Sequence, residues 1–161
     1  MTDADLQLAA ESLKLQQLIH DYCFELDLTG GLDAHRFFTE DGRLEVGKMS
    51  IDGHEQMKTF YKNFVDQVKE TEPSGQRTTR HVVANLRISF QGADAAQLDF
   101  IAMNYSSGGS APIFGTIAPT IISDACCKCR RGADGQWLIH EFTGAPIFMG
   151  DDPLQQKTLT E

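Results

Sequence analysis

The hydrophobic pattern of this chain changes its period once, at Pro73-Ser74-Gly75. Before that point apolar residues recur every three or four positions, as on one face of an α-helix. After it they alternate with polar residues, as in a half-buried strand. Helices followed by a run of strands indicate an α+β fold. We therefore expect amino-terminal helices packed on a strongly curved, mostly antiparallel sheet, which together form a cone-shaped α+β barrel with an open mouth.

Two long helices are expected in the first half of the chain. The first spans about residues 4–28 and ends at Gly30-Gly31, because glycine accepts the left-handed conformation common at helix ends. One face of this helix is apolar and carries Leu15, Leu18, Ile19, Tyr22 and Leu26. The second helix runs from about residue 54 to residue 69. Between them the pattern predicts a short helix, a turn and a short strand, at residues 33–38, 40–42 and 43–46.

Four strands are expected after residue 75, at residues 76–91, 95–105, 117–131 and 136–148. The short linkers 92–94 and 132–135 are rich in glycine and aspartate, which predicts two hairpins. The longer connection 106–115 has two interpretations, a mobile lid over a pocket and a plain hairpin loop, and the sequence favours neither. We expect one domain over residues 1–150 and a carboxy-terminal tail at 151–161.

Length and charge narrow the class of partner. A chain of 161 residues can bury a core without metals or disulfides. With 14 basic and 23 acidic residues the net charge is −9, and no basic patch stands out, so nucleic acid and membrane are not expected partners. No secretory signal or membrane-spanning apolar run is visible. We therefore expect a cytoplasmic protein whose four cysteines are reduced.

No cofactor or metal is expected. Cys126, Cys127 and Cys129 lie close together in the sequence, but a closed zinc site needs four ligands and no second cluster exists. These cysteines are interpreted as small apolar strand residues. Glycine-rich nucleotide-binding motifs and the G-x-S-x-G motif of serine hydrolases are also missing.

Several segments resemble one family. They are FFTEDGRLEVG, IDGHEQMKTFY, RHVVANLRI and DGQWLIHEFTGAPIF, at residues 37–47, 51–61, 80–88 and 134–148. With Tyr22 and Asp27 on the first helix, they resemble the SnoaL-like and scytalone dehydratase-like branch of the nuclear transport factor two superfamily. The resemblance covers most of the chain from Leu15 to Phe148. This superfamily includes dehydratases, isomerases, cyclases, oxygenase β subunits and binding modules, so the fold alone does not choose a function.

Asp27 is the first candidate catalytic residue. It lies about 120° around the helix from Leu15 and about 40° from Cys23, at the border of the apolar face. A carboxylate near a helix carboxy terminus is mildly unfavourable, which calls for a reason. The alternative is a solvated residue at the helix end. The resemblance implies a catalytic carboxylate here.

His81 is the second candidate. The resemblance implies that a histidine in this strand faces the helix aspartate, so that the carboxylate orients the imidazole and the imidazole takes a proton. Strict alternation suggests a strand histidine facing water. Thr79, His81, Asn85 and Arg87 share one parity, whereas the other parity is apolar. A β-bulge could reverse that parity locally.

Other candidate pocket residues are aromatic or amide side chains. Tyr22 matches the family's pocket tyrosine, although it lies about 140° around the helix from Asp27 and could equally be a core tyrosine. Asn104 stands at the end of an apolar strand face and is a candidate substrate contact. The expected pocket and core lining includes the phenylalanines Phe24, Phe60, Phe64 and Phe100.

The resemblance implies a cofactor-independent lyase of the dehydratase type, acting on a small, apolar, hydroxylated aromatic or alicyclic substrate. An isomerase, a cyclase or a retro-aldol lyase in the same pocket is the nearest alternative. A non-catalytic binding module or an oxygenase β-like subunit is the alternative from another class. Relatives usually associate through the outer face of the sheet, which implies a homo-oligomer, with a trimer favoured over a dimer.

Overall fold

One sheet of six strands organises the computed structural model, which describes residues 2–160. The strands are β1 (Phe38–Val46), β2 (Met49–Asp52), β3 (Arg77–Phe90), β4 (Ala95–Gly108), β5 (Ile121–Arg131) and β6 (Trp137–Met149). Their spatial order is β2-β1-β6-β5-β4-β3. All neighbouring strands are antiparallel except β1 and β6, which are parallel. The expected α+β fold with a mostly antiparallel sheet is confirmed. The sheet stays open, with β2 and β3 as its edges.

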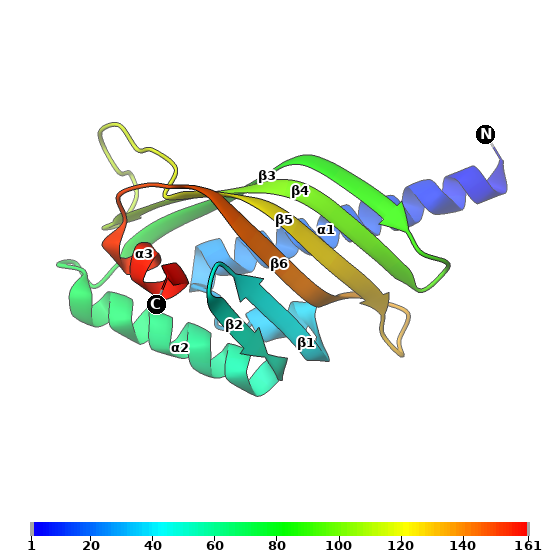
Figure 1. Cartoon of the computed structure of the whole chain (residues 1–161), viewed down its shortest axis with the longest axis horizontal. Coiled ribbons are helices and arrows are strands. Elements are labelled where there is room, and N and C mark those ends of the chain that lie inside the picture. Colours follow the sequence, from blue (N-terminus) through cyan, green and yellow to red (C-terminus); the bar gives the residue numbers. More distant parts are fainter. Residues whose placement is uncertain (1, 161) are drawn as a thin grey trace.

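Helices cover one face of this sheet. They are α1 (Asp3–Thr29), the short 3-10 helix η1 (Ala34–Phe37), α2 (Gly53–Thr71) and α3 (Pro153–Thr160). Figure 1 shows α1 running behind the strands, with α2 and α3 together at one end of the molecule. The core lies between α1 and the inner face of the sheet, where Leu15, Ile19, Leu98, Cys127 and Ile139 are fully buried.

The ends of α1 follow from its sequence. Thr2 and Asp5 form a reciprocal capping box at its amino terminus, and Gly30 ends it in the left-handed conformation at φ 76°. Gly31 also has a positive φ, and a Cβ built there would collide with the ring of Tyr61. The glycine pair therefore both stops α1 and lets α2 approach the helix end closely.

Several boundaries differ from the expectation. The predicted turn at residues 40–42 lies inside β1, where the pairing with β6 shifts register between Phe38 and Arg43 and absorbs the irregularity. β2 was not predicted, and β5 begins four residues later than expected. The tail contains α3. Asp152 caps the first turn of α3, because its carboxylate accepts a hydrogen bond from the Gln155 backbone N–H at 3.3 Å. Residues 1 and 161, the outer ends of the predicted domain and tail, lie outside the described residues.

A β-bulge in β3 decides which side chains face the core. The pairing with β4 shifts register between Ala84 and Arg87, and Asn85 has φ 54°. After the bulge Leu86, Ile88 and Phe90 pack against the core; before it Val83 does, while Val82 is 39% exposed. The alternation that suggested a solvent-facing His81 was therefore wrong before residue 85, because one extra residue reverses the parity.

Candidate active site

A cavity of about 580 Å³ lies between the inner face of the sheet and the helices. This volume is within the usual range for small-molecule sites. Most of its wall is apolar and includes side chains of α1, α2, β4, β6 and α3, such as Leu26, Phe60, Phe64, Phe100, Phe142 and Leu159. Polar side chains enter the cavity at a few points, and two of them form an acid–base pair.

Asp27 and His81 form this pair. His81 Nδ1 lies 2.7 Å from Asp27 Oδ1, and the His81 backbone N–H donates to both carboxylate oxygens at 3.0 and 3.1 Å. The Asp27 side chain is only 6% exposed, whereas the His81 side chain is 23% exposed. The carboxylate thus contacts both the ring and the backbone of His81. No hydrogen bond to His81 Nε2 is found within residues 2–160, and His81 lines the cavity.

Tyr22 belongs to a second buried polar pair. Its hydroxyl lies 3.0 Å from the hydroxyl of Tyr61, and both residues line the cavity. Burial raises the pKa of Tyr61 to about 12 and raises the pKa of Tyr22 well above its ordinary value, so both phenols are neutral at physiological pH. In such a pair one hydroxyl donates to the other, and the accepting hydroxyl keeps its own proton for another acceptor.

The ring of Tyr22 is held by three phenylalanines. Its centroid lies 6.0, 5.4 and 5.9 Å from those of Phe37, Phe38 and Phe142, all in tilted or edge-on geometry. Although Tyr22 and Asp27 point 140° apart on an ideal helix, both line the cavity, because it extends around the last turns of α1.

The other predicted residues divide into two groups. Asn104, Phe60, Phe64 and Phe100 all line the cavity. Asn104 is the β4 partner of His81 in the strand register, which places the two side by side on the inner face. Phe24 does not line the cavity and is 61% exposed. Two residues after Tyr22, it points about 200° away on the helix, toward solvent.

Sequence reasoning missed Tyr61 and the contribution of α3. No local signal in the sequence marks the contact of Tyr61 with Tyr22. Leu154, Gln155, Thr158 and Leu159 of α3 line the cavity within the predicted tail. A signal for α3 exists, because Asp152-Pro153 is an acceptor followed by proline at the first helical position.

The cysteines offer no reactive thiolate. Cys23 lines the cavity, and burial together with the nearby Asp27 charge raises its pKa to about 12. Cys127 and Cys129 are buried in the core. Within residues 2–160 no three His, Cys, Asp or Glu side chains are grouped so that they could hold a metal ion.

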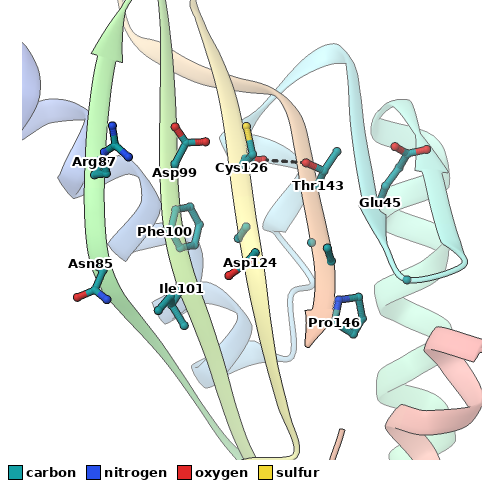
Figure 2. Close-up of a pocket in the computed structure, with 14 residues that line it drawn as sticks. Glu45, Asn85, Arg87, Asp99, Phe100, Ile101, Asp124, Cys126, Thr143 and Pro146 are labelled. Atoms are coloured by element: carbon teal, nitrogen blue, oxygen red, sulfur yellow. Dashed lines mark hydrogen bonds between the residues drawn. The ribbon is translucent and has the colours of Figure 1, made fainter. Parts of the chain in front are cut away.

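A second hollow, of about 730 Å³, lies on the outer face of the sheet. Figure 2 shows Asn85, Arg87, Asp99, Asp124, Cys126 and Glu45 around it. It contains none of the candidate catalytic residues. Although it is the larger of the two, its charged side chains form no buried acid–base pair, so we place the candidate active site in the inner cavity.

The match to a known domain family agrees with this architecture. The profile of the SnoaL-like domain matches residues 7–143. The chain belongs to the SnoaL-like family. No curated protein matches the chain. None of the helices in residues 2–160 is long and apolar enough to cross a membrane.

Solved structures share the SnoaL-like fold at low identity. A candidate scytalone dehydratase from Novosphingobium aromaticivorans superposes with a TM-score of 0.73 at 18% identity, covering 94% of this chain and 92% of that one. The ActVI-ORFA protein of Streptomyces coelicolor gives 0.71 at 13% identity, with coverages of 86% and 98%. A Catenulispora acidiphila protein in complex with S-DNPA gives 0.68 at 22% identity, with coverages of 86% and 94%. Such identities establish the fold alone.

Proposed function

We propose that this SnoaL-like protein is a cofactor-independent lyase of the dehydratase type. Its substrate would be a small hydroxylated aromatic or alicyclic molecule bound in the inner cavity. The observation that carries the proposal is the Asp27–His81 pair, with Nδ1 and Oδ1 2.7 Å apart in a mostly apolar cavity. An acid–base pair with one free nitrogen suits removal of a proton next to a leaving hydroxyl.

Each residue has a defined role in this reaction. His81 Nε2 takes the substrate proton, and Asp27 keeps Nδ1–H pointing at itself and stabilises the imidazolium that forms. The Tyr22–Tyr61 pair donates a hydrogen bond to the oxygen on which charge develops or which leaves. The imidazolium of His81 then gives this proton to the leaving hydroxyl, which departs as water and returns His81 to its starting form. The apolar wall strengthens these interactions by excluding solvent.

The family and its structural neighbours support this class of chemistry without selecting it. One neighbour is described as a candidate scytalone dehydratase, and another was crystallised with a small molecule. An isomerase, a cyclase or a carbon–carbon lyase could use the same pair. The products separate these activities: a dehydratase product lacks one water, a carbon–carbon lyase product lacks a carbon fragment, and an isomerase or cyclase leaves the mass unchanged.

The test is a screen of hydroxylated aromatic and alicyclic compounds, with mass spectrometry of the products. We expect loss of water from at least one compound class, and a fall in kcat of roughly 10² to 10⁴-fold in His81→Ala. His140→Ala is the matched control, because His140 bonds Thr39 at 3.1 Å and does not line the cavity. Equal rates in wild-type protein and His81→Ala would rule out this mechanism.

We further propose that copies of the chain associate through the outer face of the sheet. Val82, Met103, Ile122 and Phe148 are successive cross-strand neighbours there and form an apolar row. Arg87 and Asp99 lie nearby and have opposite charges, so Arg87 of one copy can pair with Asp99 of another. Light scattering should give a multiple of the chain mass, a trimer by preference, and Phe148→Asp should lower it. A monomeric wild-type protein would contradict the proposal.

A further inference from the structure

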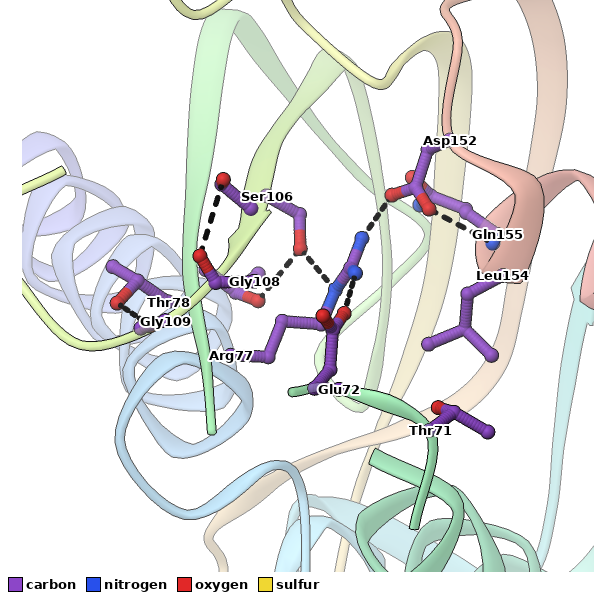
Figure 3. Close-up of polar contacts among 12 residues, drawn as sticks. Thr71, Glu72, Arg77, Thr78, Ser106, Gly108, Gly109, Asp152, Leu154 and Gln155 are labelled. Atoms are coloured by element: carbon purple, nitrogen blue, oxygen red, sulfur yellow. Dashed lines mark hydrogen bonds and ion pairs between the residues drawn. The ribbon is translucent and has the colours of Figure 1, made fainter. Parts of the chain in front are cut away.

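The end of the cavity next to α3 contains a guanidinium whose charge is already neutralised. Arg77 lines the cavity, and its side chain is 10% exposed. Its Nη1 lies 2.6 Å from Glu72 Oε1, its Nη2 pairs with Asp152, and its Nε donates to Ser106 Oγ at 2.6 Å. Figure 3 shows Arg77 between these partners. Two carboxylates and a hydroxyl thus engage the guanidinium.

The remaining cations in the cavity wall lie at its rim. The Lys69 side chain is 64% exposed and pairs with Asp66. Arg80 is exposed and donates to the Thr79 carbonyl oxygen at 2.6 Å. A ligand carboxylate at the α3 end would therefore meet an Arg77 guanidinium that is already paired with Glu72 and Asp152. The cavity favours uncharged ligands, because an unpaired buried charge is strongly unfavourable.

Gln155 adds an unused polar group at the same end. It lies in the first turn of α3 and lines the cavity. Its Oε1 is buried and has no hydrogen-bond partner within residues 2–160. Whichever way the amide is turned, one polar atom is buried without a partner, which is unfavourable and uncommon in folded proteins. A hydroxyl, which both donates and accepts, can pair with the amide in either orientation.

The cavity has polar groups at two ends, His81 at one and Arg77 with Gln155 at the other, and these ends are well separated. Arg77 precedes His81 by four residues on β3, which corresponds to roughly 13 Å along an extended strand. Asp152, paired with Arg77, begins the turn that contains Gln155. The wall between the two ends includes the apolar side chains Val83, Phe100 and Ala102.

We propose that the cavity binds an uncharged molecule with two oxygen functions, one at the His81 end and a hydroxyl that hydrogen-bonds the Gln155 amide at the α3 end. Gln155 is then a specificity-determining residue. The assignment of the first end rests on the proposed function, whereas the second end rests on the amide of Gln155 and the neutralised Arg77. The expected ligand is a flat or alicyclic diol rather than a hydroxy acid.

Three matched probes test this inference by calorimetry: 2-naphthol, 2,6-dihydroxynaphthalene and 6-hydroxy-2-naphthoate. We expect the diol to bind wild-type protein about fivefold to tenfold more tightly than 2-naphthol, the factor that one hydrogen bond typically contributes. The naphthoate should bind at least tenfold more weakly than the diol. In Gln155→Leu the diol should bind no better than 2-naphthol, while the Kd of 2-naphthol stays unchanged.

Gln156→Leu is the control on the same helix, because the Gln156 side chain donates to the Gly150 carbonyl oxygen and does not line the cavity. It should keep the preference for the diol. Gln155→Met is a second, near-isosteric variant, and thermal melting verifies that each variant is folded.

Three results would overturn the proposal: a wild-type protein that binds the diol no better than 2-naphthol, a diol preference that survives in Gln155→Leu and Gln155→Met, or a naphthoate that binds as tightly as the diol. The measurement involves no turnover. A failure of the lyase proposal would appear only in the product screen and in the kinetics of His81→Ala, so the two failures are distinguishable.

Discussion

The two faces of the sheet carry hollows of similar size and different chemistry. The inner cavity, of about 580 Å³, is closed by helices and holds a carboxylate and an imidazole in direct contact. The outer hollow, of about 730 Å³, carries Arg87, Asp99 and Asp124 without such a buried pair. The volume of a hollow therefore does not by itself identify a site. A catalytic pair needs convergent groups that the fold shields from water, and of these two hollows the inner cavity has such groups in Asp27 and His81.

The same substitution on each face should give the largest contrast. Asp27→Asn removes the carboxylate that holds His81. We therefore expect kcat for a substrate that the protein dehydrates to fall by roughly 10² to 10⁴-fold. Asp99→Asn on the outer face, where Asp99 accepts a hydrogen bond from Gln97 and does not line the inner cavity, should leave kcat unchanged. Steady-state kinetics measures both. Equal losses in the two variants would remove the distinction between the faces.

Substitutions at Asn85 test the β-bulge that turns His81 toward the cavity. Asn85→Val places a β-branched residue at φ 54°, which should cost on the order of 1–3 kcal/mol of unfolding free energy. Asn85→Gly accepts this conformation and should be close to neutral. Urea unfolding measures both. A valine variant as stable as the glycine variant would show that the bulge does not depend on residue 85.

The buried phenol pair should matter more than the tyrosine outside the cavity. Tyr61→Phe leaves the Tyr22 hydroxyl buried without its partner, so we expect a loss of about 1–1.5 kcal/mol in unfolding free energy. Tyr105→Phe is the control, since Tyr105 does not line the cavity. Denaturant titrations of the two variants should differ. If they coincide, the Tyr22–Tyr61 hydrogen bond contributes nothing to stability.

The Glu11 carboxylate should make the unfolding free energy depend modestly on pH. Hydrogen bonds from Lys14, then from Trp137 and Arg131, lower the pKa of Glu11 from 4.5 to about 2. Stability from a lowered carboxyl pKa is present above the unfolded value and is lost as the pH falls from about 4.5 toward 2. We expect about 1 kcal/mol, because Lys14 is largely exposed and solvent screens this pair.

Glu11→Gln should flatten the dependence of unfolding free energy on pH in that window. Glu141→Gln should leave it unchanged, because the outer-face pair of Glu141 with Lys128 is largely solvent-exposed. Thermal melts between pH 5 and pH 2 measure the difference. Parallel profiles for Glu11→Gln and wild-type protein would contradict the assignment.

Much of the fold followed from local patterns. The change of period at residues 73–75 predicted the helices and strands, and Gly30-Gly31 marked the end of α1, because helix and strand periods are properties of short segments. Asp27 and His81 were named from a family resemblance, and the pattern of β3 by itself pointed His81 outward. Of the other candidate residues, Asn104, Phe60, Phe64 and Phe100 line the cavity, whereas Phe24 points to solvent.

What the tertiary structure decided is which side chains meet. The bulge at Asn85 reflects the register of two strands, Tyr61 reaches Tyr22 because Gly31 leaves room for its ring, and α3 returns to the cavity through Arg77 and Asp152. These contacts join residues far apart in the chain. The sequence by itself determined the periodicity of each segment, since local sterics and the burial of apolar side chains set it. The register and approach of distant segments depend on packing and pairing summed over the whole molecule, so only the folded chain determines them.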